Sequence, residues 1–211
     1  PDLYVSTDAY LSLRSKTPQL AVFHDINFEH FPQDFPPVAL WHYKTFFHRY
    51  AKKAKGIITV SEFSKQDIVD NYHVDPDKVS VVYNGANEGF VPLPEEEKAK
   101  VRDKYTNGSP YFMFVGSLHP RKNLVRLFPA FDTFKERTGS DAKLLIVGEK
   151  RWWTNEIQSA YESLRHKSDV VFTGHLNMKE LNRVTAAALA SVYVSYFEGF
   201  GIPIIEAYKC D

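Results

Sequence analysis

The sequence of 211 residues has little of what several classes of protein require. It contains one cysteine, Cys210, so no internal disulfide can form and the chain fits a reducing compartment. Its 26 basic and 26 acidic residues cancel, which argues against a general nucleic-acid-binding protein. No apolar run approaches the length needed to cross a bilayer, and the start has neither a basic nor an apolar signal region. We therefore expect a globular, cytoplasmic chain.

Short apolar runs and helical patterns alternate from residue 110 to the end. The runs at 111–115, 144–147, 170–172 and 192–195 are rich in β-branched and aromatic residues, as strands are. The segments 124–137, 154–165 and 177–189 have the pattern of helices between them. Strands that alternate with helices form a parallel, doubly wound sheet. Pro129 falls inside 124–137 and is expected to kink or restart that helix.

The residues before 90 predict another α/β unit. Strands are expected at 19–23, 56–60 and 79–83, helices at 38–54 and 62–72, and a proline-closed loop at 26–32. Prolines and a run of glutamates then indicate a linker and an exposed helix that ends near residue 105. We therefore divide the chain into a first domain at 1–90, a linker and connecting helix at 91–109, and a second domain at 110–211.

Two glutamates, Glu198 and Glu206, stand eight positions apart around two glycines and a proline. A strand-like run precedes them, and 204–209 has the pattern of a helix start. A strand, a glycine turn and a helix N-terminus point backbone N–H groups and the helix dipole at the space above the strand, which suits an anion. A phosphate-bearing ligand with a sugar on each side would use both carboxylates. Glutamate near a helix start is also favoured by the dipole alone, so a purely structural explanation stays open.

The string E-G-F-G-I-P-I-I-E resembles the signature of retaining glycosyltransferases of family 4 (group 1), which have the GT-B fold of two Rossmann-type domains. The resemblance implies that Glu198 lies against the donor sugar and that Glu206 holds the ribose hydroxyls of the nucleotide. It also implies that the backbone amides of Gly199, Phe200 and Gly201 meet the sugar and the phosphates. The resemblance covers nearly the whole chain, which looks like a fragment of such an enzyme, incomplete at both ends.

A second candidate phosphate site follows the predicted strand at 111–115. Gly116 and Ser117 begin a loop that ends in Arg121 and Lys122 at a helix start, where the dipole disfavours cations; a functional role therefore explains them better than a solvated charge pair. Arginine grips two oxygens at once and lysine supplies a point charge. By resemblance, Lys122 holds the donor diphosphate. The family's usual arginine after the glycine is Ser117 here, and Arg121 resembles its replacement.

Two further predicted strands end in glycine, at Gly148 and Gly174. In the resembling family these loops flank the nucleotide base, which assigns Gly148 to donor binding. Trp152 and Trp153 either stack on the base or pack in the core, and the core is favoured because large aromatic side chains are usually packing residues.

His24 and Asp25 follow a predicted strand, at the edge where parallel sheets place ligand groups. A histidine there also has an ordinary explanation, which is to satisfy a nearby backbone group. The resemblance assigns His24 to the donor sugar or the acceptor hydroxyl and Asp25 to the acceptor side. Asp75 and Asp77 formally match a D-x-D metal motif, but the proline between them marks a turn on the wrong side of the unit for a ligand, so no metal site is predicted.

The helix expected at 38–54 is rich in aromatic and basic residues. It either packs its rings on a sheet and exposes its lysines, or it also lies on an anionic lipid surface. The second explanation suits a peripheral position at the inner face of a membrane and a lipid-linked acceptor.

The reaction implied by the resemblance moves a sugar, mannose by a weak preference, from a nucleotide-diphosphate sugar to an acceptor hydroxyl in polysaccharide or glycolipid assembly, with retention. The expected partners are the nucleotide sugar and a carbohydrate or lipid-linked acceptor, with no nucleic acid. No cofactor is expected, because Lys122 and Arg121 would neutralise the leaving diphosphate. The alternatives are a nucleotide-sugar-binding or assembly module without turnover and, against the two-glutamate motif, a sugar-nucleotide epimerase. A fragment of this extent is expected to bind nucleotide weakly and to transfer no sugar by itself.

Overall fold

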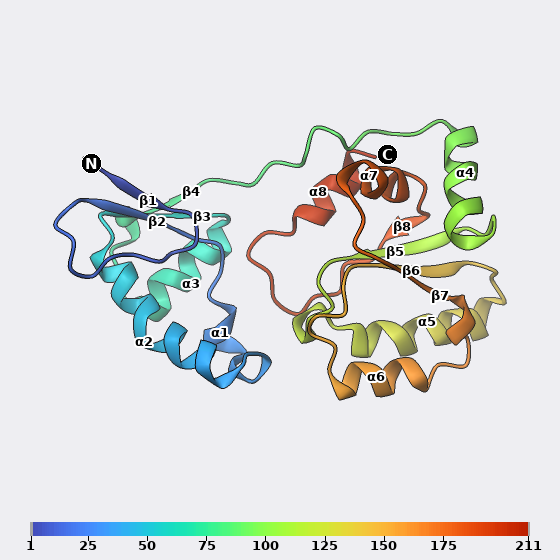
Figure 1. Cartoon of the computed structure of the whole chain (residues 1–211), viewed down its shortest axis with the longest axis horizontal. Helices are drawn as coiled ribbons and strands as arrows, with labels where there is room; N and C mark the ends of the chain where they lie inside the picture. The colour runs from blue at the N-terminus through green and yellow to red at the C-terminus, as the bar shows by residue number, and fades with distance from the viewer. Residues whose placement is uncertain (1, 211) are drawn as a thin grey trace. The chain divides into compact units, whose positions relative to one another are not determined.

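The computed structural model describes residues 2–210, which fold into two compact units (Figure 1). The first unit runs to Asn84 and also includes the later segment Phe197–Phe200. The second unit holds Gly85–Tyr196 and the chain from Gly201 onward. Each unit is built on its own sheet of four parallel strands.

The sheet of the first unit has its strands in sequence order. They are β1 (Tyr4–Ser6), β2 (Gln19–Phe23), β3 (Gly56–Thr59) and β4 (Val79–Val81). The helices of this unit are α1 (Asn27–His30), α2 (Pro37–Lys53) and α3 (Glu62–Tyr72), with short 3-10 turns at Pro32–Asp34 and Pro76–Lys78. Right-handed connections that always step in one direction place their helices on one face of a sheet, as Figure 1 shows.

An aromatic core joins these helices to the sheet. Phe23 at the end of β2 packs edge to face against Phe47 of α2, with ring centroids 5.7 Å apart, and against Tyr72 of α3. Phe28 of α1 packs on Phe47 as well. Such tilted and edge-to-face pairs add to the stabilisation from apolar burial. The core therefore fixes the end of β2, where His24 and Asp25 follow.

The second sheet has the order β7-β6-β5-β8. Its strands are β5 (Tyr111–Val115), β6 (Lys143–Val147), β7 (Val170–Gly174) and β8 (Ala190–Ser191). Its α-helices are α4 (Glu95–Thr106), α5 (Leu124–Thr138), α6 (Asn155–Glu162), α7 (Met178–Ala186) and α8 (Ile202–Tyr208), and 3-10 turns lie at Pro120–Lys122 and Lys167–Asp169.

The strand order of the second sheet reverses after β7, which makes this sheet doubly wound. α5 and α6 lie on one face, while α4 and α7 lie on the other (Figure 1). The step from β7 to β8 passes back over β6 and β5, so the switch of direction falls between β5 and β8. Open parallel sheets bind ligands beyond the carboxyl ends of their strands, near such a point.

Three local predictions from the sequence are corrected by the structure. Residues 192–195 were expected to form a strand, but β8 ends at Ser191. The last backbone hydrogen bond to β5 runs from Val192 N to Met113 O. Beyond it, the side-chain amide of Asn123 donates to Val194 O in place of a strand partner. The loop expected at 26–32 contains α1. Helix α5 runs through Pro129 without a restart, and the expected kink stays a prediction. Pro129 is exposed to water, and so is Val125, whose carbonyl loses its helical partner.

Candidate functional site

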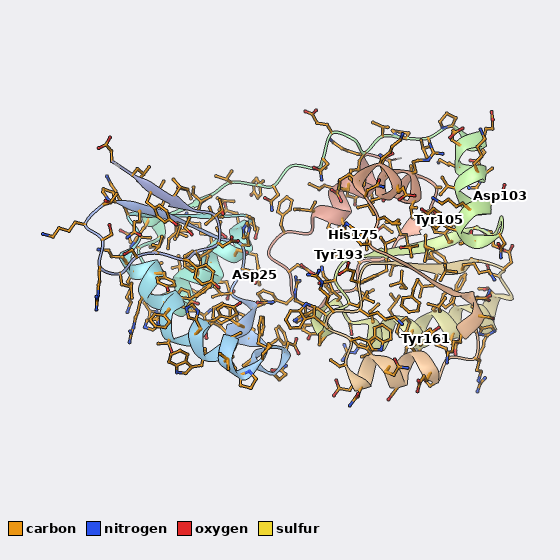
Figure 2. The ribbon with its side chains drawn as sticks, viewed as in Figure 1. Asp25, Asp103, Tyr105, Tyr161, His175 and Tyr193 are labelled. Carbon is orange, nitrogen blue, oxygen red and sulfur yellow. The ribbon has the colours of Figure 1, made fainter. Side chains whose placement is uncertain are left out.

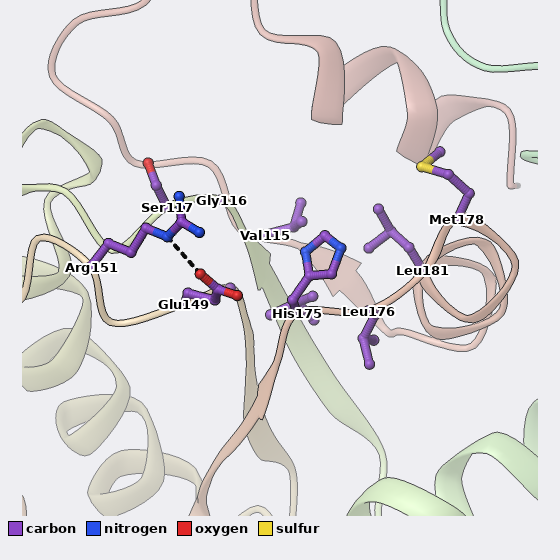
Figure 3. A pocket seen from close by; sticks show the side chains of 11 residues that line it. Val115, Gly116, Ser117, Glu149, Arg151, His175, Leu176, Met178 and Leu181 are labelled. Atoms are coloured by element: carbon purple, nitrogen blue, oxygen red, sulfur yellow. Dashed lines mark hydrogen bonds and ion pairs between the residues drawn. The ribbon is translucent and has the colours of Figure 1, made fainter.

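A cavity of about 520 Å³ lies at the carboxyl edge of the second sheet (Figure 3). We call it the strand-end cavity. The ends of β5 and β6 and the loop after β7 form its floor, and Met178 and Leu181 of α7 form an apolar wall. Glu149, Arg151 and His175 supply polar groups, and Arg151 Nε donates to Glu149 Oε2 at 2.7 Å. The cavity thus combines apolar walls with a few polar groups, as small-molecule sites do.

Two glycines, Gly116 and Gly148, allow close packing in the floor of this cavity. Gly148 has φ +148°, and a Cβ built on it would lie 1.9 Å from the Gly116 carbonyl oxygen. Gly116 has φ +149°, and its Cβ would lie 3.3 Å from Cε of Lys122. Both φ values disfavour side chains, and both positions face close neighbours. The backbone is therefore open to a ligand where Gly116 and Gly148 meet.

Lys122 is 7% exposed and packs against Gly116, which lines the strand-end cavity. Lys122 itself is not among the residues that line this cavity. Its ammonium nitrogen lies 5.5 Å from the centre of the Tyr193 ring, a cation–π distance. Gly201, the N-cap residue of α8, also faces Tyr193, since a Cβ on it would lie 3.4 Å from the tyrosine hydroxyl oxygen. The structure therefore places Lys122 beside both Gly116 and the Tyr193 ring, with Gly201 near the hydroxyl of the same tyrosine.

Arg121 and Ser117 have different positions in this loop. Ser117 lines the strand-end cavity. The backbone carbonyl of Arg121 accepts a hydrogen bond from Tyr196 N at 3.0 Å, which ties the loop to the segment after β8. The side chain of Arg121 is not among the groups that line the cavity.

Glu206 lies on α8 and is 7% exposed. Its carboxylate oxygen Oε1 accepts a hydrogen bond from Asn87 Nδ2 at 2.9 Å. A buried carboxylate is held in place by such a partner. The partner lies 119 residues away in the sequence, so spacing alone gave no sign of it.

In the first unit, His24 and Asp25 line a cavity of about 410 Å³ with aromatic walls, the aromatic cavity (Figure 2 marks Asp25). Tyr10, Phe28 and Tyr43 are among the rings that face it. His24 Nε2 lies 3.0 Å from the Thr7 carbonyl oxygen, which is the ordinary role foreseen for it, and the ring remains exposed. Asp25 Oδ1 accepts from Asn27 N at 3.1 Å at the start of α1.

The segment Phe197–Phe200, which we call the Glu198 segment, packs within the first unit. Phe197 stacks on His30 with centroids 5.1 Å apart and rings tilted by 29°. The Gly199 carbonyl accepts a hydrogen bond from Ser61 Oγ at 2.6 Å, and a Cβ on Gly199 would lie 2.2 Å from the His24 carbonyl oxygen. Glu198 and Gly199 are thereby placed beside the end of β2.

The predicted site residues thus fall into two groups. The first unit holds His24, Asp25 and the Glu198 segment. The second unit holds the group formed by Gly116, Ser117, Arg121, Lys122, Gly148, Gly201 and Glu206. That both groups surround a single ligand stays a prediction.

Several residues of these sites were not singled out from the sequence. Met178 and Leu181 have the i, i+3 spacing of any core-facing helix, so nothing marked them as cavity residues. Tyr193 was expected in a strand. For Trp153 the core prediction is confirmed, because its ring packs with Phe128, Tyr161 and Phe172. For Trp152 it is wrong, because that ring is 42% exposed and packs on His119 instead.

Asp75 caps the turn at Pro76–Lys78 through the Asp77 amide, as the turn interpretation predicted. Within residues 2–210, no group of three or more His, Cys, Asp or Glu side chains is arranged to hold a metal ion. Over the same residues, no helix has both the length and the apolar character that a membrane crossing requires.

The aromatic and basic helix α2 packs Phe47 and Tyr50 in the core of the first unit, as expected of a helix on a sheet. Two apolar side chains near its start are open to solvent: Val38 is 80% exposed and Trp41 is 64% exposed.

Comparison with known proteins identifies the family. Residues 95–211 match the model described as glycosyl transferases group 1, and residues 2–90 match glycosyltransferase family 4. The chain belongs to the group 1 glycosyltransferases. The resemblance noted on the two-glutamate motif is therefore confirmed at the level of the family.

Two bacterial relatives of this glycosyltransferase chain are named as mannosyltransferases. The O-antigen chain mannosyltransferase B of Escherichia coli is 27% identical over 209 residues, which are 99% of this chain and 55% of that protein. The O-antigen chain mannosyltransferase RfbU of Salmonella typhimurium is 30% identical over 190 residues, which are 90% of this chain and 49% of that protein. The chain therefore spans about half the length of these relatives.

Solved structures show the same fold. Anabaena Alr3699/HepE in complex with UDP-glucose has a TM-score of 0.80 at 19% identity, over 99% of this chain and 57% of that one. WaaG, a glycosyltransferase involved in lipopolysaccharide biosynthesis, has a TM-score of 0.74 at 18% identity, over 93% of this chain and 58% of that one. The predicted α/β class with two parallel sheets of GT-B type is confirmed.

Proposed function

We propose that this chain acts in the transfer of a sugar from a nucleotide-diphosphate sugar to a hydroxyl of a carbohydrate or lipid-linked acceptor. The observation that supports this most directly is that Lys122 packs on Gly116, a glycine at the rim of the strand-end cavity. A diphosphate at that rim would meet the ammonium group while the base and ribose occupy the cavity. Glu206, fixed by Asn87, is the carboxylate that we assign to the ribose hydroxyls.

The chemical demand of the reaction fits this arrangement. Breaking the anomeric C–O bond develops negative charge on the leaving diphosphate, and a preorganised cation stabilises that charge more in the transition state than in the ground state. Loss of one such donor typically costs about 2.7–4 kcal/mol of transition-state stabilisation. We assign this role to Lys122, with Arg121 as a second cation, and we propose that the transfer needs no metal ion.

The acceptor is assigned to the aromatic cavity of the first unit. Sugar rings present apolar C–H faces to aromatic side chains and hydroxyls to carboxylates, and Tyr10 and Asp25 both line this cavity. His24 and Glu198 are assigned to the donor sugar, with the anomeric configuration retained. Since the two O-antigen relatives described above are named for mannose, we propose mannose as the sugar and GDP-mannose as the first donor to test.

We propose that the exposed start of α2 contacts lipid. Trp41 and Val38 would enter the interface while lysines of the same helix meet anionic headgroups. We propose a peripheral position on the membrane that carries the acceptor. Co-sedimentation with vesicles of anionic phospholipid tests this: Trp41→Ala should reduce binding, and equal binding by both proteins would contradict it.

A thermal-shift panel of GDP-, UDP-, dTDP- and ADP-sugars tests the function first. A ligand-dependent rise in Tm with one base supports the donor assignment. Transfer of radiolabelled sugar is then measured, and Glu198→Ala should abolish it while Lys179→Ala, which changes an exposed side chain outside the strand-end cavity, should not. Tight nucleotide binding without transfer from any donor would instead favour the binding or assembly module.

A further inference from the structure

Two serine hydroxyls at the start of α3 meet the backbone of the Glu198 segment. Ser61 Oγ lies 2.6 Å from the Gly199 carbonyl oxygen. Ser64 Oγ lies 3.3 Å from the same oxygen and 3.3 Å from the His24 carbonyl oxygen. Ser64 is 1% exposed, so its hydroxyl is fully enclosed. All four residues belong to the first unit.

Each hydroxyl has one proton to donate, which determines how the bonds are shared. Ser61 accepts from Ser64 N at 3.0 Å as the N-cap of α3, and its own proton goes to Gly199 O, the shorter of its two contacts. The proton of Ser64 is then divided between His24 O and Gly199 O. The Gly199 carbonyl is therefore held by two hydroxyls of the first turn of α3.

The close approach of Gly199 makes this contact specific. A Cβ at this position would lie 2.2 Å from His24 O and 3.3 Å from Asp25 Cβ, so the backbone of Gly199 rests directly on the residues that follow β2. On the other side of Glu198, the Phe197 ring packs against His30 and, with centroids 5.6 Å apart, against Phe63. Glu198 is thus fixed from both neighbours in the sequence.

We propose that Ser61 and Ser64 are positioning residues for Glu198, holding its backbone against the end of β2 through the Gly199 carbonyl. That Glu198 serves sugar transfer from this position rests on the proposed function. The hydrogen bonds from Ser61 and Ser64 to the Gly199 carbonyl do not depend on it. Neither serine touches the reacting atoms in this account. Their effect acts through the carbonyl that each hydroxyl meets.

Substitutions at Ser61 separate positioning from helix capping. Ser61→Asp keeps an oxygen that caps α3 but has no proton for the Gly199 carbonyl. Ser61→Thr keeps both functions, and Ser61→Ala loses both. Ser64→Ala removes the enclosed hydroxyl without touching the N-cap side chain.

Chymotrypsin cleavage of this chain after Phe197 and Phe200, followed by mass spectrometry, measures how often the Glu198 segment opens. We expect Ser61→Asp and Ser64→Ala to raise the cleavage rate about two- to tenfold, as loss of one hydrogen bond predicts, and Ser61→Thr to keep the wild-type rate. Cleavage after the exposed Trp152 serves as the internal control and should not change. Wild-type cleavage rates in both Ser61→Asp and Ser64→Ala would overturn the positioning role.

Steady-state kinetics of the full protein then connects the position to turnover. Ser61→Asp should lower kcat several-fold at an unchanged KM for the donor, and Ser61→Thr should restore it. Equal kcat in Ser61→Asp and Ser61→Thr, with wild-type transfer present, would also overturn the proposal. If wild type transfers no sugar while the cleavage differences persist, the proposed function fails and the positioning of the segment stands.

Discussion

At the scale of single residues, Gly148 is a position where one methyl group has a defined effect. Its φ of +148° and the 1.9 Å approach of a Cβ to Gly116 O both exclude a side chain. Gly148→Ala should therefore lower stability by about 3 kcal/mol or more, from backbone strain and forced displacement of the loop, and weaken nucleotide binding.

Gly139→Ala is the matched control for this prediction. Gly139 also has a positive φ, +64°, but no atom lies within 4 Å of its built Cβ. Gly139→Ala should lower the free energy of unfolding, measured with denaturant, by about 1 kcal/mol. This is the cost of holding a residue with a Cβ in the left-handed backbone conformation. Equal losses at the two glycines would show that the contact with Gly116 O is unimportant.

Local signals in the sequence were enough to find some site residues and not others. Gly116 and Lys122 were found because a glycine at a strand end and a lysine at a helix start are both visible within one short loop. The pairs Asn87–Glu206 and Ser61–Gly199 join residues 119 and 138 positions apart. Such pairs depend on the fold, and no spacing in the sequence reports them.

At the scale of the elements, α5 contains an exposed proline whose removal should stabilise it. Pro129 leaves the Val125 carbonyl without its helical partner. Pro129→Ala restores that donor, and after allowance for a more flexible unfolded chain we expect a gain of about 2 kcal/mol. Pro120→Ala, at the first position of its 3-10 turn, should give no such gain in the same chemical denaturation experiment.

The turn before β7 is tied to α5 and β6 by one carboxylate. Asp169 pairs with Lys143 and, at 2.7 Å, with Lys135, which is 7% exposed. Burial acts to raise the pKa of Asp169, but the two lysines outweigh it and hold that pKa below its ordinary value of 3.8. Asp169→Asn should therefore destabilise the chain by about 3 kcal/mol at neutral pH, because it leaves a buried ammonium without its anion.

The pH dependence of this loss follows from the lowered pKa. A carboxylate with a lowered folded-state pKa contributes its stability above the unfolded value of about 3.8 and loses it as the pH falls through the folded value. The Tm difference between wild type and Asp169→Asn should thus shrink in acid, while the exposed Asp141→Asn should change little throughout. A difference that is constant down to about pH 2 would contradict the pairing.

Element types were predictable because the apolar periods are strong, and the errors have local causes. Residues 192–195 are apolar enough to suggest a strand. The side chains of Val192 and Val194 do pack on the core beside α5, but the segment is not a strand. Their backbone bonds go to Met113 and to the side chain of Asn123 instead of a continuing ladder. The apolar pattern of residues 192–195 therefore predicted correctly that these side chains pack on the core. It predicted incorrectly that their backbone forms the hydrogen bonds of a strand.

At the scale of the whole molecule, two sheets each present ligand groups at their carboxyl ends. The second unit alone contains the strand-end cavity, Lys122 and Glu206, so the proposed nucleotide binding can be tested in this 211-residue chain. The proposed sugar transfer also requires the residues of the first unit.

The central claim is that Lys122 holds the donor diphosphate, and calorimetric titration of GDP-mannose into this chain tests it most directly. Lys122→Ala should weaken binding about 10- to 100-fold, the loss of one charge-assisted contact. Lys179→Ala, which removes an exposed lysine of α7 outside the strand-end cavity, should bind as wild type does. Equal affinity for wild type and Lys122→Ala would contradict the claim.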